Sequence, residues 1–73
     1  MATEIKKDES LEKTVNGGAT LYLFKSEIEV DCPGYLPRIL FRHQDPDAVK
    51  MMHQEMLELF KEDLQKFMGR YFF

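Results

Sequence analysis

Residues 45–68 read DPDAVKMMHQEMLELFKEDLQKFM, and this stretch decides the fold because it carries the signals of one long helix. Asp45 suits the N-cap, Pro46 suits the first helical position, and the acidic Asp47 suits the positive end of the helix dipole. Gly69 follows as a typical helix stop. The sequence therefore predicts a C-terminal helix over about residues 46–68.

The apolar face of this predicted helix is wide. At about 100° per residue, its apolar positions and one histidine cover an arc of roughly 180°, whereas a helix on a single layer needs roughly 100°. The residues in the arc are Val49, Met52, His53, Met56, Leu57, Leu59, Phe60, Leu64, Phe67, Met68 and Tyr71. Asp63 also falls within it, and either pairs with Lys66 or Arg70 or sets register at an interface. The excess width indicates a second burial surface.

Two stretches before the helix alternate as strands do, at residues 19–31 and 38–44. We expect one face of residues 19–31 to pack against the core. The opposite face is apolar in its N-terminal half, and its C-terminal half is charged and expected to face solvent. The predicted core positions are Thr20, Tyr22, Phe24, Ser26, Ile28 and Val30. The other face carries Ala19, Leu21 and Leu23, then Lys25, Glu27, Glu29 and Asp31.

Two turn signals divide the N-terminal half. Asn16-Gly17-Gly18 is hairpin-turn chemistry, so residues 11–15 before it form a short strand or, alternatively, a short helical turn after Ser10. Pro33 followed by Gly34 suits the centre of a type II turn. If residues 19–31 and 38–44 pair, Arg38 and Arg42 lie on the charged face of the sheet, opposite its acidic residues.

These observations predict an α+β fold: a small antiparallel meander of two or three strands, followed by one long C-terminal helix packed on one face. Residues 11–73 are expected to form a single domain, and the charged residues 1–10 a flexible N-terminal tail.

Composition excludes several classes of protein. The chain has 73 residues, a net charge of −3 and a single cysteine, Cys32. No basic block could neutralise a row of phosphates, so nucleic acid is an unlikely partner. A lone cysteine fits a cytoplasmic location, and no apolar run approaches the roughly 20 residues of a membrane span. A domain this small leaves a thin stability margin, which favours support from another protein chain.

Chemically active residues are few and scattered. Cys32, His43 and His53 are zinc-ligand types, but their spacing matches no metal motif. Cys32 has no neighbouring base or helix N-terminus to activate its thiol. We therefore expect no catalytic residue, no metal site and no cofactor, and a metal or thiol enzyme stays a remote alternative.

The function that the sequence favours is a small non-catalytic protein-binding module, an adaptor, inhibitor or regulator that acts as a homodimer or on a heterologous protein. The predicted contact surface combines the helix, the apolar back of the sheet and the aromatic C-terminus. Its residues are Leu21, Leu23, Met51, Tyr71, Phe72 and Phe73. The alternative is a dimeric nucleic-acid-binding regulator that uses Arg38 and Arg42.

Overall fold

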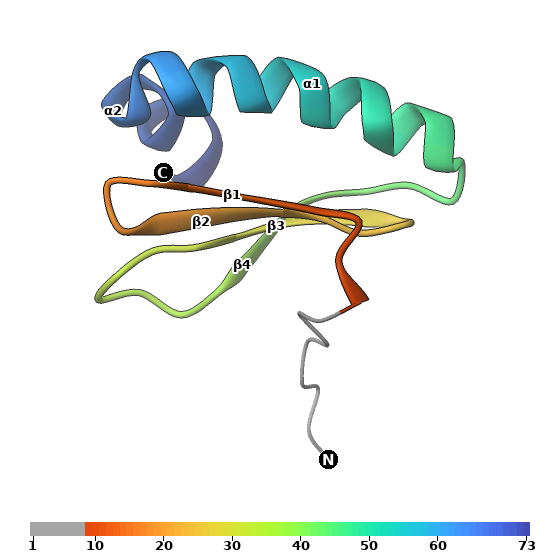
Figure 1. The fold of residues 1–73 in the computed structure, drawn as a ribbon, viewed down its shortest axis with the longest axis horizontal. Coiled ribbons are helices and arrows are strands. Elements are labelled where there is room, and N and C mark those ends of the chain that lie inside the picture. Colours follow the sequence, from red (N-terminus) through yellow and green to blue (C-terminus); the bar gives the residue numbers. More distant parts are fainter. Residues whose placement is uncertain (1–8) are drawn as a thin grey trace.

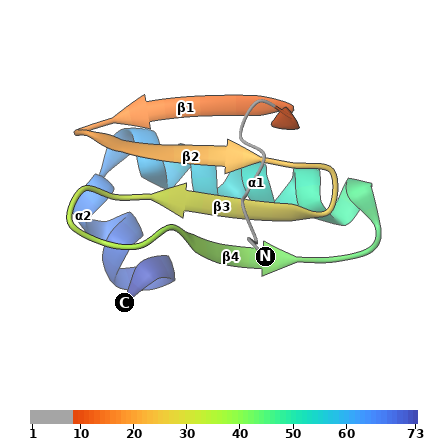
Figure 2. The same ribbon diagram turned by 90° about the horizontal axis from the view of Figure 1, so that it is seen from below.

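Residues 9–73, the part described by the computed structural model, form a four-stranded antiparallel sheet with helices on one face (Figure 1). The strands are β1 (Glu12–Asn16), β2 (Ala19–Leu23), β3 (Glu27–Asp31) and β4 (Arg38–Arg42). They lie side by side in chain order, and α1 (Pro46–Glu62) crosses behind them (Figure 2). The predicted α+β class is confirmed, with four strands in place of two or three. The predicted tail, residues 1–10, falls almost wholly outside the described residues.

The local turn and cap signals are confirmed. Gly17 and Gly18 have φ angles of +59° and +83° and link β1 to β2, so the uncertain first strand is present. The backbone N–H of Tyr35 donates to the Cys32 carbonyl across the Pro33–Gly34 turn, at 3.1 Å. At the start of α1, the Asp45 side chain accepts a hydrogen bond from the backbone N–H of Asp47.

The predicted single strand 19–31 is wrong, because the chain reverses at Lys25 and Ser26 to form β2 and β3. Leu21 pairs with Val30 and Leu23 pairs with Ile28, so odd positions of β2 share a face with even positions of β3. This change of parity places Leu21 and Leu23 in the core under the helix. Tyr22 and Thr20, which were expected in the core, lie on the opposite face of the sheet.

The charged half of that stretch also departs from the prediction. Glu29 was expected in solvent but is fully buried, next to the partly buried Glu27 and Asp31 in β3. Glu29 registers with Tyr22, which is also buried, on the face of the sheet away from α1.

The predicted long helix 46–68 is also wrong, because α1 ends after 17 residues. Asp63 has φ −150° and ψ 90°, which ends α1, and its Oδ1 accepts from the backbone N–H of Lys66 to begin α2 (Leu64–Phe67). A π-helical turn, η2 (Met68–Phe72), continues past Gly69. Asp63 therefore caps a helix, and the break explains the wide apolar arc, since α2 and η2 turn back over the end of the sheet (Figure 1).

The core lies between the sheet and this broken helix. Val49, His53, Met56 and Phe60 form the buried stripe of α1, spaced by three or four residues. Phe67 and Phe72 from α2 and η2 close one end of the core. The side chain of Asn16, the last residue of β1, donates to the Phe60 carbonyl at 2.8 Å and connects the start of the β1–β2 turn to the last turn of α1.

Candidate protein-binding groove

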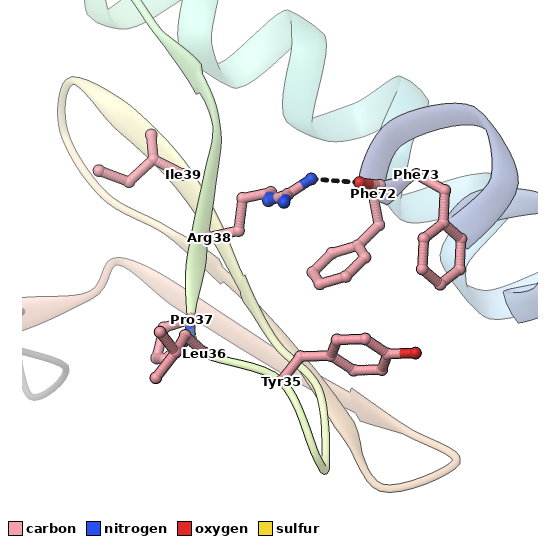
Figure 3. Close-up of a pocket in the computed structure, with 7 residues that line it drawn as sticks. All are labelled: Tyr35, Leu36, Pro37, Arg38, Ile39, Phe72 and Phe73. Atoms are coloured by element: carbon pink, nitrogen blue, oxygen red, sulfur yellow. Dashed lines mark hydrogen bonds between the residues drawn. The ribbon is translucent and has the colours of Figure 1, made fainter.

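An open groove of about 760 Å³ lies where the β3–β4 loop meets the C-terminal residues (Figure 3). One wall comes from the loop and the first residues of β4, and the other from the end of η2. The lining residues are Tyr35, Leu36, Pro37, Arg38, Ile39, Phe72 and Phe73. The lining contains a single charged side chain, Arg38, and no acidic residue.

The turn at Pro33 and Gly34 builds the first wall. Gly34 has φ +85°, a left-handed conformation that glycine adopts without strain, and it directs the following residues away from the sheet. Leu36 is 86% exposed and Tyr35 is 53% exposed, so the loop presents apolar side chains to solvent. Ile39, at the start of β4, is 38% exposed. β4 is an edge strand, and within residues 9–73 no further strand pairs with its outer side.

Aromatic contacts build the second wall. The ring of Phe72 is buried and meets the ring of Tyr35 edge-on, with the centroids 5.2 Å apart. Phe73 contacts both rings, at 5.2 Å from Phe72 and 6.0 Å from Tyr35, yet its side chain is 77% exposed. Phe72 thus anchors the C-terminus to the core, and Phe73 extends from that anchor into the rim of the groove.

Arg38 lies between the two walls because of a β-bulge. The β3–β4 register shifts between Ile28 and Glu29, which leaves Leu40 as an extra residue in β4. Arg38 consequently faces the helices, where it donates a hydrogen bond to the Phe72 carbonyl and lies 4.7 Å from the Phe72 ring centroid (Figure 3). Arg42 lies on the opposite face and pairs with Glu27 at 3.4 Å. The expectation that both arginines share the charged face is therefore correct only for Arg42.

The structure divides the six predicted contact residues. Leu21 and Leu23 lie in the core, and Phe72, although it lines the groove, is also buried, so these side chains offer almost no surface to a partner. Tyr71 is half-buried, and its ring contacts Phe67 at 5.2 Å. Met51 is exposed but belongs to the outer face of α1, away from the groove. Of the predicted set, only Phe73 is both exposed and part of the groove.

Sequence reasoning missed Tyr35, Leu36 and Ile39 as surface residues. The available signal was an apolar pair, Tyr35-Leu36, inside a segment that otherwise has turn chemistry. Apolar residues in a loop have no buried face to occupy, so they either fold back or remain exposed. The contact of this loop with the C-terminus is non-local, and periodicity contains no information on it.

A second cavity, of about 450 Å³, lies between β1 and α1. Its lining includes Leu11, Glu12, Lys50 and His53. His53 is buried, and within residues 9–73 its Nε2 atom has no hydrogen-bond partner. Burial lowers the pKa of His53, and the nearby Glu12 carboxylate partly opposes that shift.

The residues considered for metal or thiol chemistry are dispersed. Cys32 is buried beside Met68, with 3.5 Å between the two sulfur atoms. Its burial, and to a smaller extent the negative charge of Asp31, raises the pKa of the Cys32 thiol. His43 is exposed, and its Nδ1 accepts from the backbone N–H of Asp45. Among the described residues, no three histidine, cysteine or acidic side chains are placed to hold a metal ion.

No protein-family model matches the chain, and neither the curated proteins nor the solved structures include a significant match. In the described part of the chain, no helix has the length and apolar character needed to cross a membrane.

Proposed function

We propose that this protein is a non-catalytic protein-binding module and that the groove between the β3–β4 loop and the C-terminus is its contact surface. The observation that carries the proposal is that Leu36 and Phe73, two large apolar side chains that are exposed, line the same groove. Large apolar side chains that lie exposed around a groove are typical of interaction sites.

The contacts that connect the two walls of the groove support this function. The rings of Tyr35, Phe72 and Phe73 contact one another, and Arg38 joins β4 to the Phe72 carbonyl. A surface that is already ordered loses less conformational entropy when a partner binds. Aromatic and arginine side chains are also the residues that most often dominate binding energy at interfaces.

The experiment is a selection of displayed random peptides on the immobilised protein, followed by binding measurements with two variants. Leu36→Ser combined with Phe73→Ser removes one apolar side chain from each wall, and both are exposed, so the fold should be retained. Met51→Ser is the matched control, since it removes an exposed apolar side chain outside the groove. We expect selected peptides to lose binding to the double variant and to keep it with Met51→Ser. Peptides that bind all three proteins equally would contradict the proposal.

A homodimer stays a prediction for the same surface, and sedimentation at micromolar concentration tests it. The nucleic-acid alternative relied on Arg38 and Arg42 acting together. Their placement on opposite faces of the sheet gives that alternative no single cationic surface, so we favour the protein-binding function.

A further inference from the structure

We propose that the occupant of the groove is a peptide segment of a different protein, with apolar side chains that flank an aspartate or glutamate, and that the carboxylate of this residue binds Arg38. This inference rests on the proposed protein-binding function and specifies the chemistry of the partner.

The Arg38 side chain has hydrogen-bond donors and a charge to offer a ligand. Its guanidinium has five N–H donors, and one nitrogen, Nη1, donates to the Phe72 carbonyl. Within residues 9–73, no carboxylate lies within ion-pair distance of this guanidinium, whereas Arg42 has Glu27. Arg38 thus offers further donors, and a positive charge with no acidic side chain paired to it among residues 9–73, to a segment that enters the groove.

Two contacts with Phe72 hold Arg38 in position. The cation lies over the Phe72 ring and is hydrogen-bonded to the same residue, so it is oriented before any partner arrives. A planar guanidinium held in this way can bind a carboxylate through two parallel hydrogen bonds. The rings of Tyr35, Phe72 and Phe73 provide apolar surface on the side toward which Arg38 points (Figure 3), and this surface reduces the competition from water for such a pair.

The charge of the lining favours a different protein over a second copy of this chain. A two-fold contact joins the same surface patch of both copies, with residue i of one copy against residue j of the other. Two grooves docked face to face would therefore join two patches whose charged side chain is Arg38, and the lining contributes no acidic side chain that could pair with it. Charge complementarity therefore favours a heterologous acidic segment over self-association.

The test uses the peptides selected on the full chain. In a synthetic peptide whose binding requires Leu36 and Phe73, the acidic residue is replaced by its amide, Asp→Asn or Glu→Gln. We expect this change to weaken binding to the wild type about tenfold, the loss typical of one charge-assisted pair. With the Arg38→Gln variant, the same change in the peptide should hardly alter the dissociation constant, because the carboxylate then has no arginine partner to lose. With Arg38→Lys, which keeps the charge but not the planar fork of donors, the change in the peptide should weaken binding by an intermediate factor.

The outcomes separate the two proposals. Groove-dependent peptides that lack an acidic residue, or that bind equally well as amides, overturn this inference and leave the protein-binding function standing. The absence of any groove-dependent peptide overturns both. A third outcome is that the wild type forms a dimer at micromolar concentration, and that the double variant Leu36→Ser with Phe73→Ser is monomeric whereas Met51→Ser is still a dimer. This outcome assigns the groove to a second copy of the chain and overturns the proposal of a heterologous partner.

Discussion

The guanidinium of Arg38 lies 4.7 Å from the centroid of the Phe72 ring and donates a hydrogen bond to the carbonyl of the same residue. This pair joins the edge strand β4 to the last turn of the chain. It follows from the β-bulge at Leu40, because a regular strand would place Arg38 on the same face as Arg42.

The first prediction concerns the stability that this pair supplies. We expect Arg38→Ala to lower the free energy of unfolding by about 1–1.5 kcal/mol, since it removes a cation–π contact and a charge-assisted hydrogen bond at a partly solvated site. Arg42→Ala is the matched control and should cost less than about 0.5 kcal/mol, because its ion pair with Glu27 is exposed. Urea denaturation followed by circular dichroism measures both. Equal losses in the two variants would show that Arg38 does not join β4 to the C-terminus.

The second prediction is a loss of stability in mild acid that depends on His53. Burial holds the pKa of His53 below its unfolded value near 6.5, so below that pH the unfolded state binds more protons than the folded state. The free energy of unfolding should therefore fall as the pH decreases from 7 towards 5, by at most about 1.4 kcal/mol per unit of pKa lowering. Glu12 on β1 and Lys50 on α1 are the charged groups that line the same cavity, and the Glu12 carboxylate reduces the effect.

Urea titrations at several pH values measure this dependence in two variants. His53→Leu removes the titrating group and should flatten the decline between pH 7 and 5. His43→Ala removes the other, exposed histidine and should leave the decline in place. A decline that persists in His53→Leu would assign the acid sensitivity to other groups.

The third prediction is that the Cys32 thiol is unreactive in the folded protein. Its pKa is raised by burial and by the Asp31 charge, and the thiolate is the reactive form of cysteine. We expect an aromatic disulfide reagent at pH 8 to label Cys32 at least a hundredfold more slowly in the native protein than in urea. Labelling at similar rates in both conditions would show an accessible thiol and would reopen the thiol-enzyme alternative.

Much of the local structure could be predicted from the sequence, because its signals lie within a few residues of each other. The Asn16–Gly18 turn, the Pro33–Gly34 turn and the Asp45 cap each depend on backbone preferences of two or three adjacent residues. The edges of the long elements were harder to predict. The turn at Lys25 and Ser26 contains no glycine or proline, so nothing interrupted the alternation of residues 19–31.

The groove could not be predicted for a different reason. Its two walls are more than thirty residues apart in the chain, and they meet only because α1 ends at Asp63. A helix that continued straight to residue 68 would carry Phe72 away from Tyr35. The position of Arg38 depends in addition on one extra residue in β4, which only strand register reveals.

The fourth prediction tests the link between the β1–β2 turn and the end of α1. The Asn16 side chain donates to the Phe60 carbonyl, one of the carbonyl groups in the last turn of the helix that otherwise need a partner. We expect Asn16→Ala to lower the free energy of unfolding by about 1 kcal/mol. In the same turn Gly17 has φ +59°, and an added Cβ would lie 2.8 Å from Leu64 Cδ2, so Gly17→Ala should cost more than Asn16→Ala. Urea denaturation compares the free energies of unfolding of the two variants. A Gly17→Ala variant as stable as the wild type would contradict the close approach of Gly17 to Leu64.

The last prediction concerns Asp63, which ends α1 and begins α2. Its carboxylate accepts from the backbone N–H of Lys66, so we expect Asp63→Ala to lower the free energy of unfolding by about 1 kcal/mol. Fusion of the helices is not expected to compensate, because a straight helix would expose the buried Phe67 and Phe72. Glu62→Ala, at the exposed neighbouring position, should change stability by less than about 0.5 kcal/mol. If Asp63 instead set the register of an interface, the loss of stability in Asp63→Ala would depend on protein concentration. The loss caused by removing a helix cap does not depend on concentration, so urea titrations at two protein concentrations that differ about tenfold distinguish the two roles.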